Sequence, residues 1–215
     1  MGISGFVLTM MQQEYMKFKS HMAQDFSTFA CNPETKTLIT QLQLIKPEPY
    51  LLVHLEGPKK SGKKHLVRGW LSHHDINREM EEQYICDATA LDNDPEAVFH
   101  VLTRAWHEGH VIFLLSSPAG TERLKALADV RSRINGGVCL RIPPPCDLTL
   151  TVIIMRELQI HGMQIADHDM QYLLRRMPRD AQTAVTIGRY LADYMARTNK
   201  KLTKDVLFTA LSQNQ

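Results

Sequence analysis

The chain has 215 residues, of which 44% are hydrophobic and 22% charged, and its formal net charge is +2. This composition is typical of a soluble globular protein with one large domain, or a core with a small companion. A net charge of +2 is too small to imply nucleic-acid binding driven by bulk electrostatics. Cys31, Cys86, Cys139 and Cys146 lack CxxC spacing, which argues against a zinc site and a disulfide framework and favours a reducing cytoplasm. No apolar run suits a membrane span, so we expect no membrane anchor.

The first predicted element is a helix that follows a polar arm. Residues 1–23 are rich in Met and Gln, carry no core pattern and are predicted to lie outside the fold. A turn at Asn32-Pro33 precedes a helix expected over 35–45, which the sequence KPEP ends. The apolar residues on one face of this helix are Leu38, Ile39, Leu42 and Ile45.

The stretch GPKKSGKK, residues 57–64, nearly matches the phosphate-binding loop GxxxxGK[ST]. In such loops the glycines let backbone amides cradle phosphate oxygens, the lysine reaches the outer phosphates, and the hydroxyl ligates magnesium. Gly57, Gly62 and Lys63 meet the first requirements. Lys64 has no oxygen for a metal and brings an ammonium to the place of the ion. The sequence therefore predicts a phosphate loop without its magnesium hydroxyl.

The neighbours of this loop have the order that its function requires. Residues 50–55 form a short, β-prone apolar run, and residues 63–71 have helical spacing. Strand, glycine loop and helix thus follow one another. The alternative is a lysine-rich surface turn that matches the motif by chance.

Strands and helices continue to alternate after this unit. The predicted segments are a strand at 84–88, a helix at 95–109, a buried strand at 111–117, a helical stretch at 121–137 and an apolar run at 138–144. Uninterrupted apolar runs such as 111–117 are typical of parallel strands covered on both faces. The fold class expected is therefore α/β with a parallel sheet.

The sequence PPPCD, residues 143–147, marks a boundary beyond which no strand is predicted. Four helices are expected instead, over 148–162, 167–177, 179–198 and 203–213. Asp147, Asp167 and Thr203 are the predicted N-caps and Gly162 a predicted C-cap. The domains expected are an arm at 1–23, an α/β nucleotide-binding core at 24–146 and a helical lid at 147–215.

Taken in order, these segments resemble the AAA+ family of the bacterial replication initiator DnaA over nearly the whole chain. DFSTFACN is similar to a family box at the adenine end of the nucleotide, with Asp25, Phe26 and Asn32 at the matching positions. GPKKSGKKHL resembles the Walker A loop of the family. The resemblance also places Ser116 or Ser117 at the sensor 1 site.

LADVRSRINGG, residues 127–137, is the most specific similarity. It resembles a family segment whose arginine acts as a finger toward the nucleotide of a neighbouring subunit, which here implies Arg133. A guanidinium can stabilise the charge on a transferring phosphoryl group. The alternative is that Arg133 caps or salt-bridges its own helix.

Three positions depart from the family pattern. In YICDATA, Asp87 matches the magnesium carboxylate of Walker B, but Ala88 replaces its acidic partner. Gln182 stands where the sensor 2 arginine is expected, and Lys64 replaces the loop hydroxyl. These changes argue against efficient ATP turnover. We expect ADP, or a simple anion, to bind without magnesium beside the lysines of the loop, which are Lys59, Lys60, Lys63 and Lys64.

The chain ends just after the predicted lid, so no helix-turn-helix domain and no sequence-specific DNA binding are expected. This favours the short regulatory members of the family, which dock on the DNA polymerase III sliding clamp through an N-terminal peptide. Gln13, Met16 and Phe18 match that peptide as QxxMxF. The alternative is an amphipathic turn that packs on its own domain. A looser match at 41–44 lies in a helix predicted to face the core and is not assigned.

Two functional hypotheses follow. In the first, the chain is an adaptor that binds the sliding clamp and DnaA and supplies Arg133 to the ATP of DnaA. In the second, it is a working AAA+ NTPase that helps to load a helicase or transposase, and it then needs Thr89 or Ser61 as a metal ligand in place of Lys64. The sequence leaves open whether the protein is a monomer or a homodimer.

Overall fold

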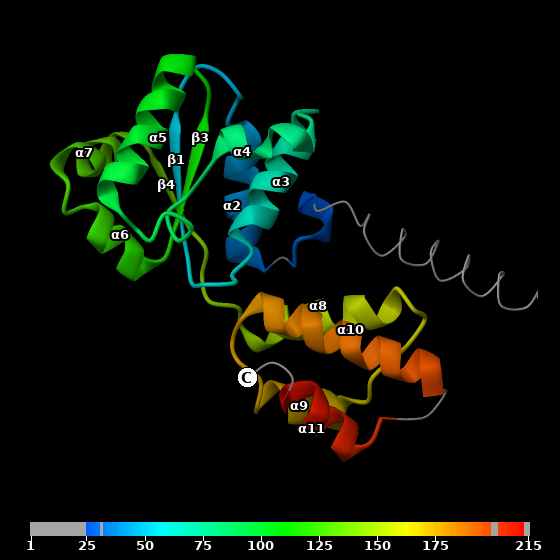
Figure 1. The fold of residues 1–215 in the computed structure, drawn as a ribbon. Helices are drawn as coiled ribbons and strands as arrows, with labels where there is room; N and C mark the ends of the chain where they lie inside the picture. Colours follow the sequence, from blue (N-terminus) through cyan, green and yellow to red (C-terminus); the bar gives the residue numbers. More distant parts are fainter. Residues whose placement is uncertain (1–24, 31, 199–201, 213–215) are drawn as a thin grey trace, which may run out of the picture.

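The computed structural model describes residues 25–30, 32–198 and 202–212. They form an α/β unit and a helical unit joined by residues 142–146 (Figure 1). The elements of the α/β unit are η1 Phe26–Thr28, α2 Pro33–Leu44, β1 Leu52–Glu56, α3 Lys63–His73, η2 Arg78–Met80, α4 Glu81–Tyr84, β2 Ile85–Asp87, α5 Pro95–Glu108, β3 Ile112–Ser116, α6 Pro118–Leu124, α7 Ala128–Gly136 and β4 Val138–Arg141. Those of the helical unit are α8 Asp147–Gln159, α9 Asp167–Leu174, α10 Ala181–Thr198 and α11 Lys204–Ser212.

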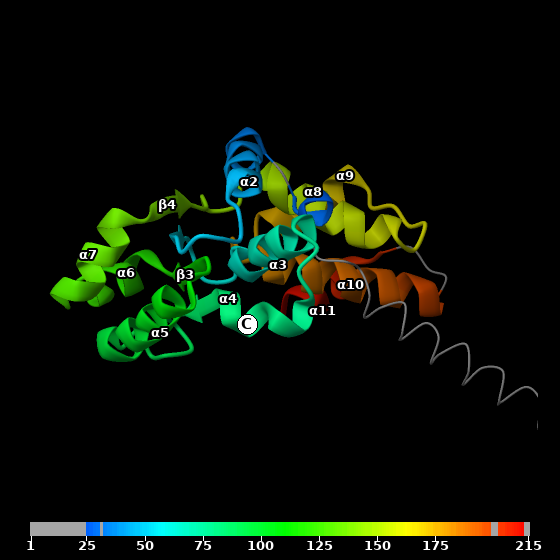
Figure 2. The ribbon, with the colours of Figure 1, turned by 90° about the horizontal axis from the view of Figure 1, so that it is seen from above.

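The four described strands form one parallel sheet in the order β2-β3-β1-β4, which confirms the predicted fold class. Every residue of β1 and β3 is buried, as expected for central strands covered on both faces. Helices α2, α3 and α4 lie on one face and α5, α6 and α7 on the other (Figures 1 and 2). Alternate strand residues therefore serve two separate cores.

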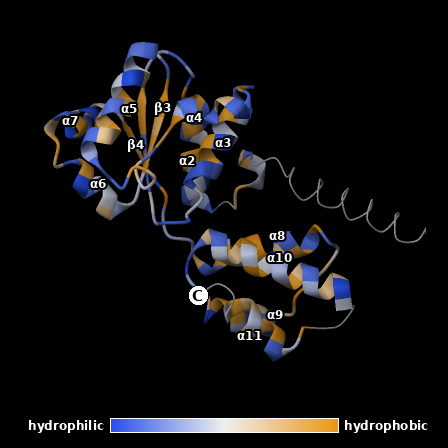
Figure 3. Ribbon diagram, in the orientation of Figure 1, coloured by the Kyte–Doolittle hydropathy of each residue, from blue (hydrophilic) through white to orange (hydrophobic). Residues whose placement is uncertain are grey.

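The two cores follow the alternation of side chains along the strands. Val53 and Leu55 of β1 pack with residues of α2 and α3, including the fully buried Trp70. Leu52 of β1 and Leu114 of β3 pack with α5 and α7 on the opposite face. Figure 3 shows the strands as a band of hydrophobic residues between more hydrophilic helices.

The local chemistry of the chain sets several helix ends. Asn32 caps α2, because its side chain accepts from Thr35 N at 2.8 Å, and Pro33 occupies the first helical position. The helix is thus two residues longer at its start than predicted. The predicted apolar face of this helix is buried, whereas Leu44, which is not part of that face, is 77% exposed.

The predicted helical stretch 121–137 is two helices in the structure. Ser117 caps α6, and its hydroxyl accepts from Gly120 N at 3.1 Å, so this helix begins before the predicted start. Leu127 has an extended backbone between α6 and α7 and breaks the run. Helices α6 and α7 are therefore separate elements.

The helical unit has its own core, to which all four of its helices contribute. Gly188 of α10 permits close packing on α8, since a Cβ there would lie 2.8 Å from Cβ of Glu157. Gly162 has a φ of +67° in the turn after α8, but the C-cap of that helix is Ile160 and not Gly162 as predicted. Asp147 and Asp167 are the first helical residues rather than the predicted N-caps, and they face the positive end of each helix dipole.

Within the described residues, no helix combines the length and apolar character that crossing a membrane requires.

Three histidines of the α/β unit have pKa values lowered chiefly by burial. His54 Nε2 lies 2.7 Å from Ser116 Oγ inside the sheet. His65 Nε2 lies 3.0 Å from Thr28 Oγ1. His74 packs against a core tryptophan ring at 4.8 Å between centroids. All three are therefore stabilised in their neutral forms.

We expect the free energy of unfolding to fall as the pH decreases from about 7.5 to 5.5. Below the unfolded pKa of about 6.5, the unfolded chain binds protons that the folded chain excludes. The stability contributed by these neutral histidines is therefore fully present above the unfolded pKa. It is lost as the pH falls from the unfolded pKa toward the lower pKa values of the folded state. Urea denaturation across this range measures the slope. His54→Gln should make the slope shallower; equal slopes in the wild type and this variant would contradict the assignment.

Candidate nucleotide-binding site

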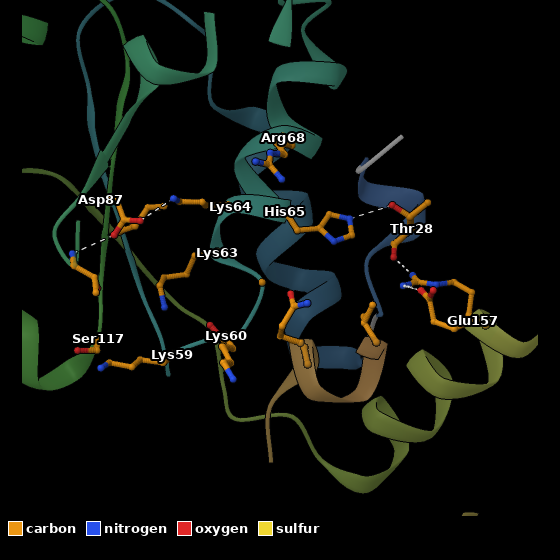
Figure 4. A pocket seen from close by; sticks show the side chains of 18 of the residues that line it. Thr28, Lys59, Lys60, Lys63, Lys64, His65, Arg68, Asp87, Ser117 and Glu157 are labelled. Atoms are coloured by element: carbon orange, nitrogen blue, oxygen red, sulfur yellow. Dashed lines mark hydrogen bonds and ion pairs between the residues drawn. The ribbon is translucent and has the colours of Figure 1, made fainter. Parts of the chain in front are cut away.

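A cleft of about 770 Å³ lies at the carboxyl ends of the strands, between the sheet and the helical unit. This edge of a parallel sheet is where ligands commonly bind in α/β proteins. Its lining comes from the loop after β1, the end of β2, the segment after β3 and helices α8 and α10 (Figure 4). The lining residues that sequence analysis had singled out are Gly62, Lys63, Lys64, Asp87, Ser117 and Gln182, with Lys59, Lys60, Ser61 and Thr89.

The glycine loop packs against the sheet and leads directly into α3. Gly57 N donates to Ser116 O at 3.1 Å, which fixes the start of the loop to β3. Gly62 has a φ of +91°, and a Cβ there would lie 2.8 Å from the ring of Phe29. Only glycine suits this position, because both the backbone and the space exclude a side chain. The loop therefore has the geometry that its motif predicts.

Lys63 is folded back onto the loop. Its Nζ donates to Gly57 O at 2.9 Å and to Pro58 O at 2.7 Å. Burial lowers the pKa of Lys63, and the nearby Asp87 carboxylate partly opposes that effect. A phosphate entering the loop offers this ammonium charged acceptors in place of two neutral carbonyls.

Lys64 forms an ion pair with Asp87, the predicted magnesium carboxylate. Lys64 Nζ lies 2.9 Å from Asp87 Oδ2, and the two side chains meet across the cleft (Figure 4). The other oxygen of Asp87 accepts from Thr89 N at 3.1 Å. Magnesium needs oxygen ligands in near-octahedral order, and an ammonium on its main carboxylate opposes it. The residues present do not fit a magnesium ion, and no cluster of metal-ligating side chains occurs among the described residues.

The helical unit contributes polar groups that sequence analysis missed. Arg156 of α8 donates to the backbone carbonyl of Thr28, which joins the two units. Arg189 of α10 pairs with the buried Glu157 at 3.0 Å. Gln182 and Arg189 are seven residues apart on α10 and both line the cleft. A spacing of seven residues places both side chains on the same face of a helix, which the sequence alone could have indicated. Whether that face of α10 lies at the cleft depends on how the helical unit packs on the α/β unit.

Two buried polar atoms at the cleft have no hydrogen-bond partner within the part of the chain that the structure describes. They are Ser61 Oγ, on a residue that is 6% exposed, and Arg156 Nε. Both residues line the cleft and also an adjoining pocket of about 70 Å³. Unpaired buried polar atoms are uncommon, because each costs about 1–3 kcal/mol. Their position fits a polar ligand that would satisfy them.

The residues predicted at the adenine end lie beside the cleft. Asn32 lines the adjoining pocket as well as capping α2. Asp25 caps η1 by accepting from Thr28 N at 3.0 Å, and Phe26 packs on Gly69 of α3. Asp25 and Phe26 thus shape the segment without lining either hollow. They position Thr28, which lines both.

The two candidate serines of sensor 1 have different surroundings. Ser116 is fully buried, and its hydroxyl lies 2.7 Å from His54 Nε2 and 2.8 Å from Thr121 Oγ1. Ser117 lines the cleft at the start of α6. Ser117 is therefore the serine that a ligand in the cleft can reach.

Arg133 lies on α7, apart from this cleft. Its guanidinium stacks over the ring of Phe99 at 4.9 Å from the centroid. It lines a separate pocket of about 350 Å³ with Tyr50 and Trp106. The alternative to the finger role was a contact of Arg133 within its own chain. Such a contact exists, but it is a cation–π contact with Phe99 and not the expected cap or salt bridge. The predicted clamp-binding residues Gln13, Met16 and Phe18 lie outside the described residues.

Comparison with known proteins supports the fold. No protein-family model and no curated sequence matches the chain. Domain III of the Thermotoga maritima replication initiation protein DnaA superposes with a TM-score of 0.68 at 14% identity, over 90% of this chain and 97% of that one. The Thermotoga maritima RuvB Holliday junction branch migration motor gives 0.59 at 15% identity over 88% and 72%. A replication initiator DnaA bound to AMPPCP and single-stranded DNA gives 0.59 at 14% over 83% and 69%. The chain has the fold of AAA+ domains.

Proposed function

We propose that this AAA+ protein is a regulator of replication initiation like Hda, the regulatory inactivator of DnaA. In this proposal it binds the DNA polymerase sliding clamp and promotes ATP hydrolysis by DnaA in the bacterial cytoplasm. The observation that carries the proposal is the ion pair between Lys64 and Asp87. Lys64 occupies the carboxylate of Asp87, which would bind magnesium in a site that hydrolyses ATP. The hydrolysis is therefore assigned to the nucleotide site of a partner.

Other features of the cleft support the same view. Ala88, which is fully buried, offers no carboxylate beside Asp87 to activate a water. Gln182 faces the cleft with a neutral amide where hydrolysing relatives are expected to present an arginine. The cleft nevertheless keeps its shape and its positive lining. We infer that it holds a nucleotide, with ADP as the candidate, in a structural role.

The place of Arg133 suits action on a second molecule. It lies on α7 and lines a pocket that, among the described residues, shares none with the cleft. From that position, Arg133 does not reach a nucleotide in the cleft of its own chain. A DnaA molecule docked on this surface could instead bring the DnaA-bound nucleotide to Arg133. The peptide with Gln13, Met16 and Phe18 would meanwhile hold the protein on the clamp.

The direct test follows the nucleotide bound to DnaA. DnaA loaded with radiolabelled ATP is mixed with this protein, with clamp on DNA, or with both. We expect rapid conversion to ADP only when both are present. Unchanged conversion in the complete mixture, with clamp binding verified, would contradict the regulatory role.

A second candidate is a working AAA+ NTPase that helps to load a helicase or transposase. It is favoured by Thr89 and Ser61, two hydroxyl-bearing residues of the cleft lining that are the remaining candidate metal ligands. A steady-state ATPase assay separates the candidates, with Lys63→Ala as the control. Turnover above about 1 per second, within the usual range of enzymes, and lost in the control would favour the NTPase.

A further inference from the structure

Lys64 and Asp87 together change what the cleft can bind. We propose that the cleft binds a nucleoside diphosphate without a divalent cation, and that the ammonium of Lys64 takes the place of the metal. This inference rests on the nucleotide site proposed above and adds its ligand chemistry. Asp87 then acts as the anchor of Lys64 and is not a metal ligand.

The geometry gives Lys64 donors to spare. Its Nζ lies 2.9 Å from Asp87 Oδ2, and the lysine side chain is 51% exposed. An ammonium has three donors, so one bond to Asp87 leaves two for phosphate oxygens. Lys64 follows Lys63 in the first turn of α3, and both project toward the cleft (Figure 4). The pair thus provides two ammonium groups at the end of the glycine loop.

The charges around the cleft oppose a divalent cation. Of the described residues, eight lysines and arginines line it but only two carboxylates, Asp87 and Glu157. Each carboxylate is already paired, Asp87 with Lys64 at 2.9 Å and Glu157 with Arg189 at 3.0 Å. A metal ion would have to displace an ammonium or rely on neutral hydroxyls. An anion meets no such competition.

The same lining explains the choice of a diphosphate. The loop amides and Lys63 are placed for the phosphates nearest the loop. In metal-dependent sites the ion bridges the β- and γ-phosphates and neutralises the outer charge. Without the ion, one tethered ammonium neutralises less charge than a divalent cation does. The unpaired Ser61 Oγ, on a residue that is 6% exposed, supplies a further polar group for the bound ligand.

The test measures the affinity of the full-length protein for fluorescent ADP, in EDTA and in magnesium. Wild-type affinity should agree within about twofold between the two conditions. Lys64→Thr removes the tethered ammonium and supplies the missing hydroxyl. Its affinity in EDTA should fall about tenfold, and magnesium should restore most of the loss. Lys59→Thr is the matched control, since it makes the same substitution at a cleft lysine other than the one paired with Asp87; magnesium should not rescue it.

A second variant is expected to change ADP affinity in opposite directions at a metal-free site and at a metal-dependent site. Asp87→Asn leaves Lys64 free to face the phosphates, so ADP affinity in EDTA should stay the same or rise about threefold. At a metal-dependent site the same change weakens binding in magnesium. Thermal unfolding of each variant, with and without ADP, checks folding and gives an independent reading of binding.

The outcomes separate this inference from the regulatory proposal. Wild-type ADP binding that requires magnesium, or binding by Asp87→Asn that is weakened in magnesium but not in EDTA, would overturn the metal-free site and leave nucleotide binding intact. No ADP binding in either condition would overturn both the site and this inference. Metal-free ADP binding in a protein that fails to act on DnaA would support the inference and count only against the regulatory role.

Discussion

Replacing Arg133 by alanine is expected to reduce the DnaA-bound ATP hydrolysis stimulated by this protein by about 10³-fold or more. An arginine supplied in trans to a transferring phosphoryl group contributes about 10³–10⁵ to the rate in related reactions. The Arg133 side chain is set on α7 by its contact with Phe99, on a surface separate from the cleft of its own chain. The measurement is the rate of conversion of DnaA-bound ATP to ADP, with clamp on DNA present.

Two further variants sharpen this test. Arg133→Lys keeps the positive charge but loses the planar fork of donors, so it should recover little of the stimulation. Arg131→Ala, at an exposed position on the same helix, should leave the rate unchanged. If Arg133 serves only its contact with Phe99, Arg133→Ala should cost about 0.5–1 kcal/mol of stability and leave the stimulation intact.

Much of the fold could be predicted because its signals are local. The predominantly apolar runs at 50–55 and 111–117 identified two strands that prove to be central, since a strand covered on both faces has mostly apolar residues. Asn32-Pro33 and Gly162 marked breaks in the chain close to helix ends through their own side-chain or backbone properties, although the exact ends differ by two residues. The order β2-β3-β1-β4 could not be predicted, because apolar runs do not say which strands are neighbours.

For the candidate site too, residues in a local motif could be predicted and residues brought together by packing could not. Gly62, Lys63 and Lys64 follow one another in the loop, so a motif could find them. Arg156 and Arg189 come from the helical unit, and only the packing of that unit on the sheet brings them to the cleft. Their contacts join residues far apart in sequence, for which one sequence carries no signal.

The identity of Lys64 could be read from the sequence, but its consequence needed the structure. A lysine in place of a hydroxyl indicates only that one metal ligand is missing. The 2.9 Å contact with Asp87 shows that the second expected metal ligand is occupied as well. Two positions that look independent in the sequence thus form one interaction in space.

Replacing Gln13, Met16 and Phe18 together by alanine is expected to abolish binding to the sliding clamp. Burial of the two apolar side chains stabilises such a complex by about 1.5–3 kcal/mol each, so the loss corresponds to about 10²- to 10⁴-fold in affinity. Surface plasmon resonance with immobilised clamp measures the change. The matched control is Gln41→Ala with Leu44→Ala, which removes the looser motif on α2 where Leu44 is 77% exposed.

The triple variant also separates clamp binding from action on DnaA. On the proposed role, the protein held on the clamp would meet DnaA at a raised local concentration, an effect that requires no new contact between the two. The triple variant should therefore fail at low concentration and recover part of its stimulation of DnaA when its concentration is raised well above that of the wild type. Arg133→Ala should not recover at any concentration, because in the proposed role this residue acts on the nucleotide itself. Retained clamp binding by the triple variant, or its loss in the α2 control, would contradict the assignment of the peptide.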